Sequence, residues 1–103
     1  MNPEIAWAAG LFEGEGSITH VYGRTQLRIQ MADHEVLERF LKIVGVGKIY
    51  APYTKPHRDG FNRKPRWIWI CEGPLAHTIF RTLAPWLSTR RRERGREVGI
   101  DFP

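Results

Sequence analysis

Cysteine is nearly absent from this chain, and that scarcity excludes several kinds of site. Cys71 is the single cysteine among 103 residues, so an intrachain disulfide and a CxxC zinc site are both excluded. It lies in the apolar run 67–71, where we expect a buried thiol in a reducing, intracellular compartment. The four histidines show no spacing typical of a metal site.

Long apolar runs and a basic leader are also missing. A membrane-spanning helix needs about 20 consecutive apolar residues, and no stretch of that length occurs. We therefore expect no membrane partner, and a cytoplasmic or organellar, nucleoid-associated location. The length favours a single domain, 1–103, with one core, and no internal repeat is present.

Acidic residues are outnumbered. The chain has 11 Asp and Glu against 16 Lys and Arg, a net charge of +5 and a pI near 9.9. Such a balance favours a polyanionic partner, nucleic acid above all, although a merely basic protein would share it. With 42% hydrophobic residues, we expect a folded, globular chain.

One segment, 8–16, does not suit a helix of a stable monomer. Each glycine in a helix interior costs roughly 1 kcal/mol relative to alanine, and acids at the carboxyl end oppose the helix dipole. Two glycines four residues apart would leave a bare strip for a second helix. The acids at its foot would then meet those of the partner, where divalent cations are needed. The segment reads Ala8, Ala9, Gly10, Leu11, Phe12, Glu13, Gly14, Glu15, Gly16.

This segment resembles the nine-residue signature of the LAGLIDADG homing endonucleases. Glycines stand at its third and ninth positions, a small residue at the seventh, and acids at the sixth and eighth, both Glu rather than Asp. A second family-like stretch, 83–90, is a Pro-aromatic-Leu segment that ends in Arg90, where the family usually has Lys. The resemblance covers essentially the whole chain.

The order of the expected elements agrees with that family. Capping residues, apolar periodicity and turn signals predict an α+β chain, αββαββα with a basic tail helix. The resemblance implies a saddle-shaped antiparallel sheet with helices on its back and DNA under its concave face. The expected helices are about 3–16, 33–44, 73–85 and 88–98, and the strands are 18–21, 25–31, 48–53 and 66–71.

Several side chains are expected in the core. The third helix would bury an apolar face, and all four tryptophans lie on apolar faces, so we expect them to be core residues and not base-stacking platforms. His20 should face the core side of its strand. The helix face is Leu75, Ile79, Phe80 and Leu83, and the tryptophans are Trp7, Trp67, Trp69 and Trp86.

The resemblance implies a role for each acid. Glu15 matches the metal-binding, catalytic acid, and the Gly14 carbonyl can add a ligand. Mg²⁺ is the implied cofactor, with Mn²⁺ or Ca²⁺ able to substitute for binding. Arg90 is implied near the scissile phosphate, although Arg91 or Arg92 could fill that register and a solvated helix is the alternative. Arginine in place of lysine cannot act as a base.

Glu13 matches the structural acid, which in the family reaches toward the start of the partner's helix. The implied dimer interface is Ala6, Ala9, Gly10, Glu13 and Gly14. A single motif builds half of an active site, so we expect a homodimer on a pseudo-palindromic target. A heterodimer with a paralogue is the alternative.

Polar side chains alternate along 24–30, a pattern that fits either a DNA-reading strand or a solvated sheet face. With the family resemblance we favour DNA contact. The loop cations would contact phosphates, unless the loop is simply solvated. The predicted DNA-binding strand residues are Ser17, Thr19, Val21, Arg24, Gln26, Arg28, Gln30, Lys48, Tyr50, Arg66 and Ile68, and the loop residues are Lys55, His57, Arg58, Arg63 and Lys64.

The resemblance therefore predicts a site-specific endonuclease that makes Mg²⁺-dependent double-strand breaks in a long duplex. The competing hypothesis is a non-cleaving binder of the same fold, either an RNA-splicing maturase that binds intron RNA or a DNA-binding regulator. A structural assembly protein is a third possibility, but it leaves the acidic motif unexplained.

Overall fold

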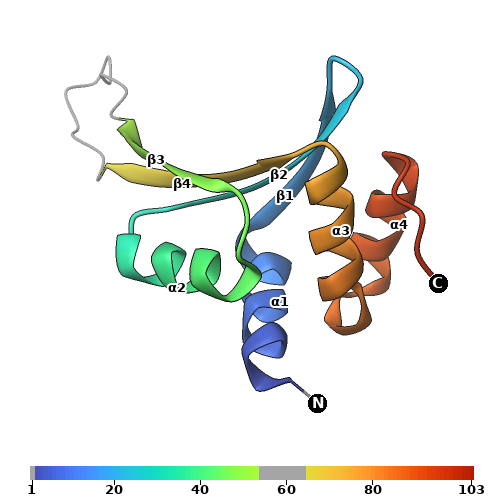
Figure 1. Ribbon diagram of the computed structural model, residues 1–103, viewed down its shortest axis with the longest axis horizontal. Coiled ribbons are helices and arrows are strands. Elements are labelled where there is room, and N and C mark those ends of the chain that lie inside the picture. Colours follow the sequence, from blue (N-terminus) through green and yellow to red (C-terminus); the bar gives the residue numbers. More distant parts are fainter. Residues whose placement is uncertain (1, 54–64) are drawn as a thin grey trace.

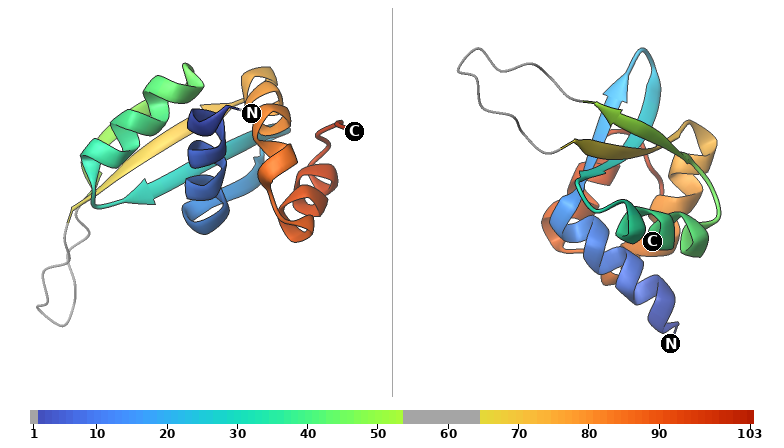
Figure 2. Two further views of the ribbon diagram at one scale, coloured as in Figure 1. Left: turned by 90° about the horizontal axis from the view of Figure 1, so that it is seen from below. Right: turned by 90° about the vertical axis from the view of Figure 1, so that its left-hand side faces the viewer.

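The computed structural model describes residues 2–53 and 65–103. One antiparallel sheet of four strands, in the order β1-β2-β4-β3, carries the helices on one of its faces (Figures 1 and 2). None of the helices in these residues is long and apolar enough to cross a membrane. The elements are α1 Pro3–Glu15, β1 Gly16–Val21, β2 Arg24–Met31, α2 His34–Val44, β3 Lys48–Tyr53, β4 Arg66–Glu72, α3 Pro74–Leu83, a 3-10 turn Ala84–Trp86, and α4 Thr89–Glu97.

The predicted order of elements and the fold class are confirmed. Helix boundaries follow their capping signals: the Asn2 side chain accepts hydrogen bonds from two backbone N–H groups of the first turn of α1, and Asp33 does the same once for α2. Gly45 ends α2 in the left-handed conformation, at φ 78°, which glycine adopts without strain. The cation-rich loop residues Lys55, His57, Arg58, Arg63 and Lys64 lie outside the described residues.

The core lies between the sheet and the helices. Leu27 is opposite Cys71 and Ile29 is opposite Trp69 in the two central strands, and all four side chains are buried. The Trp69 indole donates a 3.0 Å hydrogen bond to the Val46 carbonyl oxygen, so this large apolar side chain is buried without an unpaired donor. Burial raises the pKa of the Cys71 thiol, and neighbouring Glu72 adds to the effect.

Two expectations about the core are wrong. Leu75 is 54% exposed, because α3 turns Ala76, and not Leu75, toward the sheet together with Ile79 and Phe80. Trp86 is 40% exposed. It belongs to the 3-10 turn that Pro85 initiates, and there the side chains that flank the turn, including Leu87, are buried instead.

The β1–β2 hairpin turn contains a strained residue. Tyr22 has a φ of 50° and Gly23 a φ of 77°, the pair of positive values that a type I′ turn requires. Glycine adopts this conformation freely, but for an ordinary L-residue it costs about 1–2 kcal/mol. The Tyr22 side chain is fully exposed, so no packing within the described chain offsets that strain.

We therefore expect Tyr22→Asn to raise the free energy of unfolding by about 1 kcal/mol, since asparagine tolerates the left-handed region. Urea denaturation of the purified chain measures it. Tyr22→Phe is the matched control and should leave stability unchanged, because the strain lies in the backbone. A Tyr22→Asn variant no more stable than the native chain would show that the turn is not strained.

Candidate nucleic-acid interface and acidic helix end

The face of the sheet turned away from the helices carries the polar residues predicted to read DNA. Opposed residues of an antiparallel pair point to the same side, so the register defines rows across this face. The rows are Val21 and Arg24; Thr19, Gln26 and Glu72; Ser17, Arg28, Ile70 and Lys48; and Gln30, Ile68 and Tyr50. Arg66 extends the same side of β4. That these predicted residues share one face is confirmed, and their contact with DNA stays a prediction.

Two residues of this face were not predicted. Ile70 and Glu72 alternate with the buried Trp69 and Cys71, so they share the side of Ile68. The period-two pattern of β4 would have revealed them if it had been extended through the whole strand. The prediction ended this strand at Cys71, one residue before Glu72.

The carboxyl end of α1 and the amino end of α4 are joined by reciprocal hydrogen bonds. The Glu13 carboxylate accepts from the Ser88 backbone N–H at 2.6 Å and from the Ser88 hydroxyl at 3.0 Å. In return, the Arg91 guanidinium donates a 3.0 Å hydrogen bond to the Glu13 carbonyl oxygen. An acid thus lies at the positive start of α4 and a cation at the negative end of α1, the signs that helix dipoles favour.

This geometry agrees with a structural role for Glu13, because its carboxylate is bound within its own chain at the start of α4. Its contact with the start of a partner's helix stays a prediction. Partial burial opposes ionisation, but the hydrogen bonds from Ser88 and the charges of Arg91 and Arg90 outweigh it and hold the pKa of Glu13 below its usual value. The Arg91 Nε lies 3.6 Å from the carboxylate, an ion pair beyond hydrogen-bonding distance.

The structure separates the neighbouring arginines by their surroundings. Arg91 is half-buried and engaged with Glu13, whereas Arg90 is exposed. The Arg92 guanidinium donates to the Thr89 hydroxyl within its own helix. Arg90 lines a hollow of about 350 Å³ together with Ser17, which belongs to the polar sheet face. Of these three arginines, Arg90 is therefore the one that is exposed beside that face.

Glu15 and Gly14 lie at the exposed end of α1, where the chain enters the first strand of the polar sheet. A carboxylate and main-chain carbonyls are hard oxygen donors, which Mg²⁺ and Ca²⁺ prefer, so the donor chemistry fits the metal that the resemblance implies. Within residues 2–53 and 65–103, no three His, Cys, Asp or Glu side chains come together in a metal-binding cluster.

The motif glycines differ in what surrounds them. A Cβ atom on Gly16 would lie 2.4 Å from the Phe12 ring, so packing inside the chain requires that glycine, whereas Gly10 and Gly14 are exposed and a Cβ there would meet no atom within 4 Å. Of the predicted interface residues, Ala9 is completely buried within the chain. It therefore cannot contact a partner, and that prediction is wrong.

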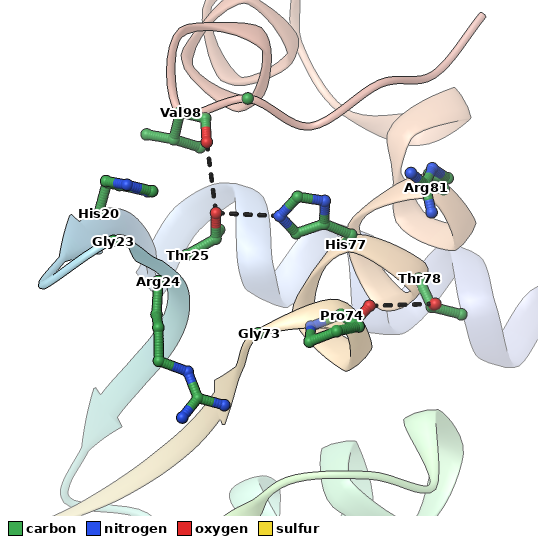
Figure 3. A pocket seen from close by; sticks show the side chains of 11 residues that line it. His20, Gly23, Arg24, Thr25, Gly73, Pro74, His77, Thr78, Arg81 and Val98 are labelled. Atoms are coloured by element: carbon green, nitrogen blue, oxygen red, sulfur yellow. Dashed lines mark hydrogen bonds between the residues drawn. The ribbon is translucent and has the colours of Figure 1, made fainter.

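A second pocket, of about 580 Å³, lies between the β1–β2 hairpin, the start of α3 and the end of α4 (Figure 3). The Thr25 hydroxyl donates to the Val98 carbonyl oxygen, so it accepts the 3.0 Å hydrogen bond from His77 Nε2. Figure 3 shows the Arg24 side chain running toward Gly73. Arg81 lies on the side of α3 away from Arg24. His20 faces this pocket from the helix side of β1, as expected, but it is exposed. The hydrogen-bonded groups tie three elements together, which is a structural role.

The Glu13–Ser88 contact predicts a pH-dependent loss of stability. Because the pKa of Glu13 is lower in the folded chain than its ordinary value of 4.5, the contact stabilises above that value, and the contribution is lost as pH falls through the folded pKa. We expect Glu13→Gln to lower the free energy of unfolding by about 1 kcal/mol at pH 7, for a partly exposed charged hydrogen bond. The difference should shrink toward pH 3.

Urea denaturation between pH 3 and pH 7 tests this expectation. The matched control is Glu35→Gln, which removes an exposed acid at the start of α2 and changes net charge equally. A Glu13→Gln difference that stays constant with pH would mean that the carboxylate charge does not stabilise the junction of α1 and α4.

No protein-family model matches the chain, and no curated protein is similar to it. Solved structures are similar. The homing endonuclease I-CvuI in complex with its target Sro1.3 in the presence of Ca matches 93% of this chain at a TM-score of 0.64 and 20% identity. The same enzyme with the I-CreI target and Mg, its DNA not cleaved, gives a TM-score of 0.61 at 19% identity over 93% of this chain.

A third similar structure is the archaeal intron-encoded homing endonuclease I-Vdi141I complexed with DNA, which matches 87% of this chain at a TM-score of 0.57 and 18% identity. The chain spans 61–64% of the length of these proteins. At such identities the likeness establishes the fold alone. Together with the αββαββα order and the four-stranded antiparallel sheet, it confirms the predicted architecture: this chain has the LAGLIDADG homing endonuclease fold.

Proposed function

We propose that this chain is a DNA endonuclease that acts as a homodimer. It binds a long pseudo-palindromic duplex on its two polar sheet faces and makes Mg²⁺-dependent breaks in both strands. The observation that carries the proposal is the position of Glu15. It is exposed at the carboxyl end of α1, where the chain continues into the first strand of the polar sheet. The similar solved structures are DNA complexes of homing endonucleases.

The outer face of α1 supports the dimer. Gly16 is required by packing inside the chain, but Gly10 and Gly14 have open space around the Cβ positions. Glycines in a helix lower its stability, so a surface strip of them suggests that a second backbone has to approach closely there. Ala6 extends the strip one turn toward the start of α1 and is only half-buried.

The polar sheet face supports recognition of a duplex. Arg24 and Arg28 can bind the O6 and N7 atoms of guanine, and Gln26 and Gln30 can bind the N6 and N7 atoms of adenine. These four residues alternate along β2 at the middle of the face. Val21 and Ile68 offer apolar contacts to thymine methyl groups, while the cations at the rim would position the backbone.

The acidic end of α1 supports cleavage. Glu15 supplies one carboxylate per chain, so the second carboxylate comes from a second copy, and the Gly14 carbonyl adds an oxygen donor. A bound Mg²⁺ would activate water and neutralise charge on the scissile phosphate. Arg90, exposed beside Ser17, would hold a phosphate oxygen by charge-assisted hydrogen bonds.

One residue favours a second candidate function. Arginine at position 90, where the family usually has lysine, stays charged and cannot act as a base. That substitution suits a non-cleaving binder of the same fold, such as a maturase that binds intron RNA or a DNA-binding regulator. A pure binder, however, does not need an exposed carboxylate beside main-chain carbonyls at the end of α1, a set of oxygen donors that suits a divalent metal.

We expect Glu15→Gln to abolish double-strand cleavage while duplex affinity stays within about threefold, because the amide keeps the shape and loses the charge that binds the metal. Cleavage of a pooled palindromic duplex library, with Mg²⁺ or with chelator, measures the first effect, and gel-shift titration measures the second. Glu4→Gln, at the opposite end of the same helix, should cut normally. Full cleavage by Glu15→Gln would exclude Glu15 from the active site.

Gly10→Leu should weaken dimerisation by about 100-fold or more, since the leucine would separate the two helices. The monomer should fold at least as well, because leucine is the better helix former by up to about 1 kcal/mol and nothing lies within 4 Å of the new Cβ. Sedimentation velocity gives the association state. Glu35→Leu, on the exposed side of α2, is the control for an added surface leucine. An unchanged dimer would refute the glycine strip as the interface.

A further inference from the structure

Glu72 occupies an unexpected place for an acid. It ends β4 directly opposite Gln26, which in turn lies opposite Thr19, so these three residues form one row across the polar face. Glu72 is exposed. At the strand positions of this face that the structure describes, its carboxylate stands alone among four cations, Arg24, Arg28, Lys48 and Arg66.

The fold gives Glu72 no evident structural task. It makes no side-chain hydrogen bond or ion pair with the other described residues. The nearest candidate partner along the chain is Arg24, but its guanidinium lies over the next residue: a Cβ atom placed on Gly73 would be 2.9 Å from Arg24 Nη2. The carboxylate is therefore available at the surface.

A free carboxylate on this face opposes binding to every duplex, because it approaches a polyanion. Its presence is explained if it raises discrimination at the expense of affinity. In the major groove, guanine presents only acceptors, N7 and O6, which repel a carboxylate. Cytosine presents the N4 amino donor, and adenine presents a donor beside the N7 acceptor.

We propose that Glu72 is a specificity-determining residue that accepts a hydrogen bond from the N4 amino group of one cytosine in each half-site. The proposal rests on the proposed function, since it requires the sheet face to enter the major groove. Gln26, next to it in the row, would contact the neighbouring base pair, and Thr19 lies beyond Gln26.

The experiment selects sequences from a randomised palindromic duplex library with Ca²⁺ in place of Mg²⁺, for the native chain and for Glu72→Gln. We expect the native profile to contain one cytosine per half-site whose preference falls about 5- to 150-fold in the variant, as expected for a side-chain-to-base contact worth about 1–3 kcal/mol. Affinity for unrelated duplex should rise. Glu35→Gln changes the net charge equally from the helix side, and its profile should match the native one.

A second variant tests whether residue 72 itself contacts that base. Glu72→Arg should exchange the preferred cytosine for guanine at that same position, because arginine binds guanine O6 and N7. Far-UV circular dichroism confirms that both variants fold, which the exposed position favours.

The outcomes are distinguishable. A native profile that Glu72→Gln leaves unchanged overturns this inference alone, as does a lost preference for any base other than cytosine. A native chain that binds no duplex overturns the proposed function, and this inference falls with it.

Discussion

The carboxylate of Glu13 joins the first and last helices of this chain, at the carboxyl end of α1 and the amino end of α4. It accepts both hydrogen bonds that Ser88 can offer at the start of α4, while Arg91 returns one to the last turn of α1. Each helix end thus receives a partner of the opposite charge. Because Glu15 is two residues beyond Glu13 and Arg90 two residues beyond Ser88, this contact fixes where the exposed acid and the exposed arginine lie.

The same contact explains how a very basic helix is held to the body. Helix α4 has little apolar surface of its own, and its backbone approaches the core at Gly95, where a Cβ atom would lie 2.4 Å from the Phe80 ring. Arg94 adds a 3.2 Å hydrogen bond to the Ile18 carbonyl oxygen. Arg96 also lies 4.4 Å over the Phe102 ring, so α4 is held along its length, and Arg90 at its start is exposed.

Because side chains alternate along each strand, the two faces of the sheet differ. One side buries Leu27, Ile29 and Trp69 under the helices, and the opposite side presents polar groups in rows. Packing of the core and the chemistry of the polar face therefore depend on different side chains of the same strands. Residues such as Glu72 can change on the polar side without disturbing the core.

Local chemistry allowed the sequence to predict most of the fold. Asn2, Asp33 and Ser88 cap helix starts because their side chains accept N–H groups of their own first turns, and residues of these types are recognisable as caps in a sequence. Strand β2 was evident from its period of two. Exposure was harder to predict: Leu75 and Trp86 are apolar, but neighbouring residues occupy the core positions because the helix phase after Gly73 and the turn at Pro85 place them there.

The order of elements, the exposed glycines of α1 and the acids beside them could be predicted from the sequence, because these features depend on residues close together in the chain. Other features follow from the tertiary structure: Glu13 binds Ser88, 75 residues away, Ala9 is enclosed, Arg91 is engaged while Arg90 is exposed, and Glu72 lies on the polar face. Those outcomes depend on strand register and helix docking, which bring together residues that no local pattern relates.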